Sequence, residues 1–212
     1  MIAVVALADS DPIAEAVLRF YRAYRTPAVP ADSVDVLRSA SHIILAGAAS
    51  FEEGIRRLRD AGFVRPLIRS ISDGVPVLAV SGGMHLLFDV AHDGGQHTGL
   101  GIVPGKVRPM LKSSAQAGAA QPATPFAHCA WAAVRRRSPC ALLAGLPEDT
   151  EFYFDHTRVA EPLDVRDHVG VCRADEPFCA VVERGRTFGV QFDPHRSGPA
   201  GERVLLNFCE LA

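Results

Sequence analysis

Short apolar runs alternate with segments of helical periodicity through the first half of the chain, and this alternation constrains the fold more than any other feature. Ile2 to Leu7 is a continuous apolar run, which is typical of a strand buried on both faces. His42 to Leu45 is the next β-type run, and Phe51 to Asp60 places Ile55 and Leu58 on one helical face. Since strands that alternate with helices pair in parallel, the sequence predicts an α/β fold: a three-layer sandwich with a central, mainly parallel sheet.

A helix is predicted directly after the first strand, with Ser10 or Asp11 as its N-cap and Pro12 in its first turn. The second half of the chain has shorter β-type runs, which predict a smaller β-rich extension. These runs are Phe152 to Phe154, Val169 to Cys172, Cys179 to Glu183 and Thr187 to Phe192, with a hairpin turn at Glu183 to Arg186 and a closing helix at Gly201 to Glu210. Met110 to Thr124 is rich in Ala, Ser, Gly, Gln and Pro and is predicted to be a flexible loop.

The size and charge of the chain limit what it can do. Its 212 residues fit one domain, and we expect a single domain over residues 1–212 with a core large enough to hold a rigid site. The net charge of -2 argues against a nucleic-acid partner. The compact basic run Arg135-Arg136-Arg137 is too short to change that conclusion and is typical of a solvated surface or a partner contact.

The cysteines and the N-terminus bear on the cellular compartment. Five cysteines without a CxxC pair predict reduced thiols in the cytoplasm. The apolar N-terminus has no basic region before it, so it predicts a buried strand and not a signal peptide. No apolar run approaches the length of a membrane span.

The segment from Gly74 to Phe88 carries the most information about function. An apolar strand, Val77 to Val80, leads into the turn Ser81-Gly82-Gly83 and then into a predicted helix that reaches Val90. A nucleophile elbow is built in this way, with one side chain at a sharp turn beside a helix N-terminus. The segment alone is equally compatible with a tight strand–helix turn that has no chemistry.

The same segment resembles the G-x-P-x-L-G-I-C-x-G-M-Q-L-L-F motif of class I glutamine amidotransferases, in the form used by the glutaminase subunit of imidazole glycerol phosphate synthase. Five further segments match motifs of that family in the correct order. They are Leu45 to Phe51, Gly99 to Val107, Phe126 to Trp131, Tyr153 to Thr157 and Gly189 to Gly198. The resemblance covers nearly the whole chain and implies the flavodoxin-like α/β fold of that family, without a cofactor.

The resemblance also implies a mechanism. In the family a Cys thiolate on the elbow attacks glutamine, a His deprotonates it, and a Glu two residues later orients the His. Here these positions hold Ser81, Asp193 and His195. Serine is a poorer nucleophile than a thiolate, and a carboxylate with an ordinary pKa of about 3.9 is a weak base. Glutamine hydrolysis by the family route is therefore predicted to be lost.

An oxyanion and substrate pocket is implied beside the elbow. Its positions in this chain are Gly47, Ala48, Ala49, Gly82, Met84 and His85. Several of them depart from the family motifs: Ala46 replaces a Pro, Ala49 replaces a Gly and His85 replaces a Gln. The sequence leaves open whether this altered pocket binds a small-molecule ligand.

The leading hypothesis is a pseudo-glutaminase that supports a (β/α)8-barrel cyclase or synthase partner. One alternative is a glutaminase subunit that retains activity by an altered mechanism. Another is a serine hydrolase or amidohydrolase, since Ser81, His195 and Asp193 form by type a Ser-His-Asp set, although the family positions put Asp193 next to Ser81. No metal is predicted, because His85, Asp193 and His195 lack the spacing of a known metal motif and are expected to form a polar cluster.

Three residues lie in segments that the family places near its barrel partner. His128, Trp131 and His156 are therefore predicted interface residues. The simpler interpretation is that the two histidines are satisfied polar groups and that Trp131 belongs to the core. The loop Ala6 to Asp11 departs from the family's D-Y-G-M-G-N sequence, which also alters the surface expected to dock.

Overall fold

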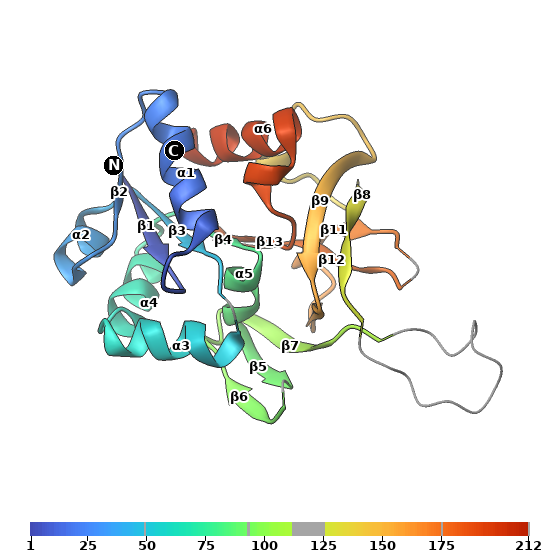
Figure 1. Cartoon of the computed structure of the whole chain (residues 1–212), viewed down its shortest axis with the longest axis horizontal. Helices are drawn as coiled ribbons and strands as arrows, with labels where there is room; N and C mark the ends of the chain where they lie inside the picture. The colour runs from blue at the N-terminus through green and yellow to red at the C-terminus, as the bar shows by residue number, and fades with distance from the viewer. Residues whose placement is uncertain (49, 93, 112–125, 175, 212) are drawn as a thin grey trace.

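The computed structural model describes residues 1–48, 50–92, 94–111, 126–174 and 176–211 (Figure 1). Its strands are β1 (Ile2–Ala6), β2 (Ala28–Pro30), β3 (His42–Ala46), β4 (Val77–Val80), β5 (Phe88–His92), β6 (Gln96–Thr98), β7 (Val103–Pro109), β8 (His128–Arg136), β9 (Thr150–His156), β10 (Arg158–Pro162), β11 (His168–Cys172), β12 (Phe178–Arg184) and β13 (Thr187–Val190). Its helices are α1 (Pro12–Ala23), α2 (Val34–Ser39), α3 (Phe51–Asp60), α4 (Val64–Ser72), α5 (Gly82–Leu86) and α6 (Gly198–Cys209), with short 3-10 turns η1 (Ala141–Leu143) and η2 (Pro194–Arg196).

The central sheet has the strand order β2-β1-β3-β4-β13-β12-β11-β8-β9. The strands from β2 to β13 pair in parallel, and the inner strands β3, β4 and β13 are buried on both faces, with β1 buried from Ile2 to Val5. Helices α1 and α6 pack on one face, whereas α2 to α5 cover the other (Figure 1). The predicted α/β class and three-layer arrangement are therefore confirmed.

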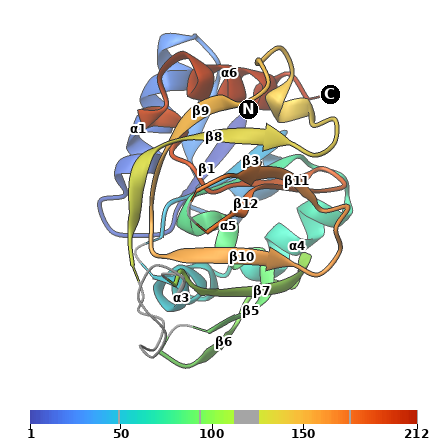
Figure 2. The same cartoon turned by 90° about the vertical axis from the view of Figure 1, so that its right-hand side faces the viewer.

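The β-rich extension takes two forms. Strands β12, β11, β8 and β9 continue the central sheet in antiparallel fashion beyond β13. A second sheet, in the order β10-β7-β5-β6, lies beneath it (Figure 2). Strands β12 and β13 are joined by a tight turn at the predicted hairpin, with Gly185 at φ +60°. The strands that carry His128 and His156 thus reach the same sheet as Ser81.

Local sequence explains where the first helices begin. Asp11, and not Ser10, caps α1, because its carboxylate accepts hydrogen bonds from the backbone nitrogens of Ile13 at 2.9 Å and Ala14 at 3.2 Å. Ser50 caps α3 by accepting from the backbone nitrogen of Glu53 at 3.2 Å. Ile55 and Leu58 of α3 are buried as predicted. These two helices therefore begin directly at the carboxyl ends of β1 and β3.

The helix predicted to extend from Ser81 to Val90 is wrong beyond its first turns. It ends at Leu86, and Val90 lies in β5, where it pairs with Thr98 of β6 and Lys106 of β7. Ladder hydrogen bonds to strands distant in sequence outweigh the helical spacing of the apolar residues. Of the loop predicted from Met110 to Thr124, residues 112–124 lie outside the described chain, and Met110 itself is fully buried.

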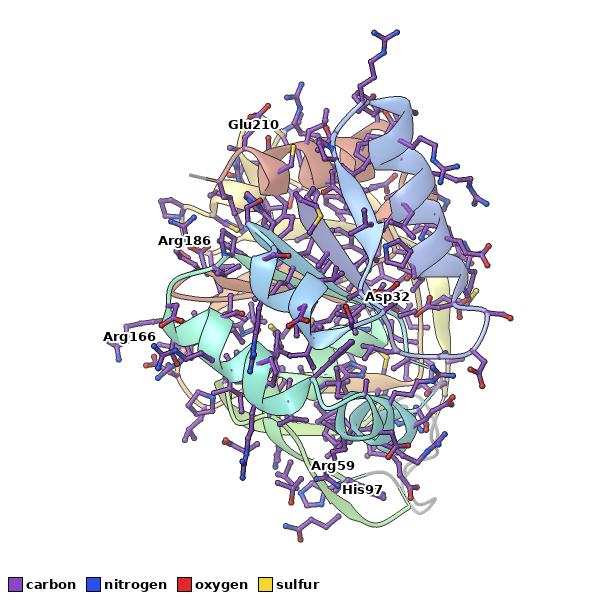
Figure 3. The ribbon with its side chains drawn as sticks, turned by 90° about the vertical axis from the view of Figure 1, so that its left-hand side faces the viewer. Asp32, Arg59, His97, Arg166, Arg186 and Glu210 are labelled. Carbon is purple, nitrogen blue, oxygen red and sulfur yellow. The ribbon has the colours of Figure 1, made fainter. Side chains whose placement is uncertain are left out.

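The surface of the parallel half is polar. Arg59 of α3 and His97 of β6 lie beside each other along a shallow hollow, while Arg186 marks the turn between β12 and β13 (Figure 3). No helix within the described ranges is long and apolar enough to cross a membrane. All five cysteines are unpaired.

The packing of α6 against η2 yields a prediction about stability. A Cβ atom on Gly201 would lie 1.9 Å from the carbonyl oxygen of Pro194, so the backbone of η2 would have to move. We expect Gly201→Ala to lower the free energy of unfolding by about 3 kcal/mol, measured by urea denaturation. Gly95→Ala is the control, since its Cβ would meet only His97 Nε2 at 3.5 Å. Equal urea midpoints for Gly201→Ala and the unmodified protein would contradict the close approach.

Candidate functional site

Ser81 stands at the sharp turn between β4 and α5. Its backbone has φ +54° and ψ -120°, a conformation that non-glycine residues seldom adopt and that is common at functional turns. Its amide donates to the carbonyl oxygen of Val190 in β13 at 2.7 Å, and its carbonyl accepts from Met84 at 3.0 Å. The side chain, 8% exposed, is thereby held at the carboxyl edge of the parallel strands, where ligands bind in open α/β sheets.

The two glycines after Ser81 are required by close backbone contacts. A Cβ on Gly82 would lie 2.6 Å from the carbonyl oxygen of Ala48, and one on Gly83 would lie 2.5 Å from that of Leu45. The loop after β3 therefore packs directly on the elbow. Gly47 has φ +68° and Ala48 has φ +155°, so this loop also adopts a strained backbone. Ala49 lies outside the described chain.

Asp11 connects this loop to β1 and was not recognised from sequence as a site residue. Besides capping α1, its carboxylate accepts from the backbone nitrogen of Leu7 at 3.2 Å. It also lies against Gly47, where a Cβ would come within 2.4 Å of Oδ2. Burial is the main cause that raises the pKa of Asp11, against three backbone hydrogen bonds that lower it. The only hint in the sequence is its position as a candidate N-cap.

A small pocket of about 170 Å³ opens in front of the elbow. The residues that line it are Ala48, Ser50, Phe51, Ser81, Gly82, His85, Asp155, His156, Thr157, Arg158 and Gln191. Of the predicted pocket positions, Ala48, Gly82 and His85 are among them. Met84 is not, because its side chain is fully buried in the core and lies beside Gly189. Gly47 supports the loop behind the pocket without lining it.

His85 and Gln191 form the floor of this pocket. Nε2 of His85 lies 2.7 Å from Oε1 of Gln191, so the imidazole donates to the amide oxygen. Gln191 is completely buried, and its Nε2 has no hydrogen-bond partner in the described chain. A buried amide donor without a partner costs free energy, which a ligand oxygen in the pocket would recover. Gln191 was quoted in a sequence motif but not predicted as a site residue.

His156 and His128 continue the polar chain away from the pocket. Nδ1 of His156 donates to the carbonyl oxygen of Arg158 at 2.8 Å, since a carbonyl can only accept. Burial lowers the pKa of His156 to about 3, and the charges of His85 and His128 lower it further against the Arg158 hydrogen bond. The ring is therefore neutral, and its Nε2 accepts from Nδ1 of His128 at 3.3 Å.

Asp193 is the titratable group on which Ser81 acts. The Ser81 side chain lowers the pKa of its carboxylate, which is 5% exposed and has Arg196 Nη1 at 3.8 Å from Oδ2. Burial raises the pKa of Asp193 to about 6, although Ser81 and Arg196 lower it; Asp155 and Asp11 add to the increase. Its Oδ1 is buried without a hydrogen-bond partner in the described chain. The site thus holds a carboxylate that is close to its titration point near neutral pH.

His195 lies in η2, and its Nδ1 is buried without a hydrogen-bond partner in the described chain. Its pKa is lowered by burial and then by the positive charges of Arg196 and Arg19. It does not line the pocket. Ser81 therefore influences Asp193, whereas no hydrogen bond from His195 Nδ1 reaches either residue. Within the described residues no three His, Cys, Asp or Glu side chains are arranged to hold a metal ion, so His85, Asp193 and His195 do not form one.

The three predicted interface residues lie on the β8–β9 ladder but face different ways. His128 and His156 are register partners and point inward, where both rings pack against Phe178. Trp131 is 52% exposed and packs edge-to-face on Tyr153 with ring centroids 6.0 Å apart. The guanidinium of Arg196 lies 3.8 Å from the Tyr153 ring. Trp131 therefore presents an exposed aromatic side chain, and Arg196 connects its neighbour Tyr153 to Asp155, which lines the pocket.

Comparison with known proteins finds close similarity to one named subunit, although no family model matches the chain. The imidazole glycerol phosphate synthase subunit HisH of Desulfitobacterium hafniense is 34% identical over 182 residues, which cover 86% of this chain and 82% of that protein. HisH of Moorella thermoacetica is 34% identical over 185 residues, or 87% and 83% of the two chains. HisH of Bdellovibrio bacteriovorus is 33% identical over 199 residues, or 93% and 94%.

Solved structures share the fold. A crystal structure of a glutamine amidotransferase superposes with a TM-score of 0.69 at 16% identity and covers 99% of this chain and 97% of its own. PurLQS from Thermotoga maritima superposes with a TM-score of 0.70 at 16% identity, with coverages of 98% and 97%. At these identities the likeness concerns the fold alone.

The raised pKa of Asp193 predicts how stability depends on pH. Between about pH 4 and pH 6 the folded protein binds a proton that the unfolded chain releases, so the free energy of unfolding falls as pH rises through this window. Asp193→Asn removes the ionisable group and keeps an acceptor for Ser81. We expect this variant to be more stable than the unmodified protein by about 2 kcal/mol at pH 8, with the difference vanishing near pH 4.

Urea denaturation at intervals from pH 4 to pH 8 measures this difference. Asp155→Asn is the matched control, because Asp155 is exposed and also pairs with Arg196, at 3.1 Å. We expect a change below about 0.5 kcal/mol for the control. A stability difference for Asp193→Asn that is independent of pH would show that the carboxyl titrates normally.

Proposed function

Because this chain belongs to the family of the imidazole glycerol phosphate synthase subunit HisH, we propose that it is a glutaminase-like subunit that has lost glutamine hydrolysis. It would support a (β/α)8-barrel cyclase partner structurally or allosterically, with ammonia taken from solution. The observation that carries the proposal is that Ser81 acts on Asp193, whose pKa it lowers, while Nδ1 of His195 is buried without a hydrogen-bond partner in the described chain. The five unpaired cysteines support a cytoplasmic location for such a complex.

The chemistry at Ser81 supports loss of activity. A serine hydroxyl needs a base that takes its proton and then returns a proton to the leaving group. Asp193 has a pKa of about 6, so it is mostly ionised at neutral pH and can accept a hydrogen bond from Ser81. A carboxylate of this basicity is far weaker than an alkoxide, so proton transfer from Ser81 is strongly uphill. The contact therefore stabilises the hydroxyl without activating it.

The rest of the scaffold supports retention of a ligand-binding and partner-binding role. The elbow, the loop after β3 and the pocket in front of them are all in place, and the polar floor at Gln191 has an unused donor. The relatives are named as subunits of a synthase, and Trp131 offers an exposed aromatic contact beside the pocket. We propose that this surface receives the barrel partner.

Two other functions make different predictions. A glutaminase with an altered mechanism would release ammonia once the partner is bound. A serine hydrolase built from Ser81 and His195 would be labelled at Ser81 by a phosphonylating probe. Burial and then the charges of Arg196 and Arg19 lower the pKa of His195, which supports neither the altered glutaminase nor the serine hydrolase.

The first test measures ammonia release from glutamine, with and without the barrel partner. We expect no release above that of Ser81→Ala, because no group near Ser81 can activate it. With an ammonium salt, the synthase activity of the complex should be the same for Ser81→Ala and for the unmodified protein, within about twofold. Glutamine-dependent activity that disappears in Ser81→Ala would contradict the proposal. The Ser81→Cys, Asp193→His, His195→Glu variant tests whether the scaffold can still be reactivated.

The second test concerns the partner surface. We expect Trp131→Ala to weaken binding of the barrel partner by at least about tenfold, since exposed aromatic residues often dominate interfaces. Isothermal titration calorimetry measures the affinity, and Leu163→Ala is the control because Leu163 is 83% exposed but lies at the end of β10. Equal affinities for both variants would place the interface elsewhere.

A further inference from the structure

A hollow of about 390 Å³ lies on the antiparallel half of the central sheet, away from the pocket at Ser81. Its lining consists of Arg135, Arg136, Arg137, Val171 and Arg173, none of which lines the Ser81 pocket. Figure 2 shows β8 and β11 side by side; these strands supply Arg135, Arg136 and Val171, and Arg137 and Arg173 directly follow their ends. Four guanidinium groups therefore gather at one hollow, and among the described residues no carboxylate lines it.

The strand register explains why three of these arginines share a face. Arg135 of β8 is the antiparallel partner of Val171 in β11, so their side chains point to the same side of the sheet. Arg137 lies two residues after Arg135, and Arg173 lies two residues after Val171, so both continue that face. All three arginines are exposed, and Val171 is half-buried between them. The cluster is thus a consequence of pairing between segments 36 positions apart along the chain, as Arg135 and Val171 are.

Most of the positive charge in the hollow is not neutralised. Arg136 pairs with Glu148, with Nη2 and Oε1 2.8 Å apart. Arg137 donates from Nη1 to Nδ1 of His168 at 3.3 Å, and burial together with the Arg137 charge lowers the pKa of that neutral ring. Arg135 and Arg173 form no ion pair with any carboxylate in the described chain. Like charges in this arrangement repel one another, and a bound anion would relieve the repulsion.

A slot of about 370 Å³, lined by both polar and apolar side chains, adjoins the hollow and shares Arg137 and Val171 with it. Val159, Pro162 and Phe178 contribute apolar surface to the slot. Arg108 also lines it but is neutralised by Glu161 and Glu176, each with a nitrogen–oxygen distance of 2.5 Å. The free positive charge is therefore confined to the Arg137 end, which lies next to the hollow.

We propose that this hollow binds the phosphoryl group of a small phosphorylated heterocyclic ligand, with the ring of that ligand in the adjoining slot. Guanidinium groups bind phosphate oxygens in bidentate geometry, and a phosphoryl dianion has enough oxygens to contact several arginines at once. A positive hollow beside a slot of mixed polarity fits one small molecule with a charged end and a flat, partly polar ring. The site is separate from the pseudo-glutaminase proposal, because it needs neither Ser81 nor the barrel partner.

Isothermal titration calorimetry with AMP, pyrophosphate and adenosine tests the proposal on the full chain. We expect AMP to bind more tightly than pyrophosphate and at least about tenfold more tightly than adenosine. The affinity for AMP should be lower at about 0.15 M salt than at low salt. The Arg135→Gln, Arg173→Gln double variant should weaken AMP binding by at least about tenfold. Arg22→Gln, an exposed arginine in the last turn of α1, should leave it unchanged.

Each other result overturns the proposal or one part of it. Absence of AMP binding at low salt, or equal affinity in the double variant and the Arg22→Gln control, would overturn the site. Equal binding of AMP and pyrophosphate would overturn the role of the slot while upholding the phosphoryl site. If the double variant instead weakens only the barrel partner, the arginines form a protein contact and the ligand proposal fails. Circular dichroism of the double variant checks that it remains folded.

Discussion

The backbone of Gly83 packs against the carbonyl oxygen of Leu45, and that of Gly82 against the carbonyl oxygen of Ala48, so closely that neither position has room for a side chain. The whole site depends on this contact. It joins the loop after β3 to the turn after β4, two neighbouring parallel strands. Asp11 reinforces it from β1 by lying against Gly47 and accepting from Leu7. Three adjacent strand ends are thereby held in one arrangement, and Ser81 has little freedom to leave its strained backbone conformation.

This contact constrains the backbone and does not determine which side chain performs chemistry. Glycine is needed at positions 82 and 83, where a Cβ atom would meet the backbone of the loop after β3. A fold held by such backbone contacts does not by itself specify the chemistry at its site. The side chains present here have a cost, because Asp193 is buried with an unpartnered Oδ1 and a pKa of about 6.

Buried groups around the elbow differ in charge at neutral pH: Asp193, with a pKa of about 6, is mostly ionised, whereas His156 is neutral. His156 has a pKa of about 3 and exchanges hydrogen bonds with His128 and the Arg158 carbonyl, so it adds no charge to the pocket. Positive charge gathers instead on the outer face of β8 and β11, at Arg135 and Arg173. The two proposed binding sites therefore differ in character: one is a small polar pocket with an unused amide donor, and the other is a cationic hollow beside a slot of mixed polarity.

The sequence by itself determined the features that depend on neighbours along the chain. The alternation of apolar runs and helical periodicity predicted the parallel half of the sheet, and the Val77 to Gly83 segment predicted the elbow, because strand burial and small turn residues are local signals. Only the tertiary structure decided which distant groups meet. Val90 became a strand through pairing with β6 and β7, and His85 met Gln191 across 106 positions. It also placed Met84 in the core and left Nδ1 of His195 buried without a hydrogen-bond partner in the described chain. Residue types fix which hydrogen bonds and charges are available, but sheet pairing and packing decide which of them come within reach.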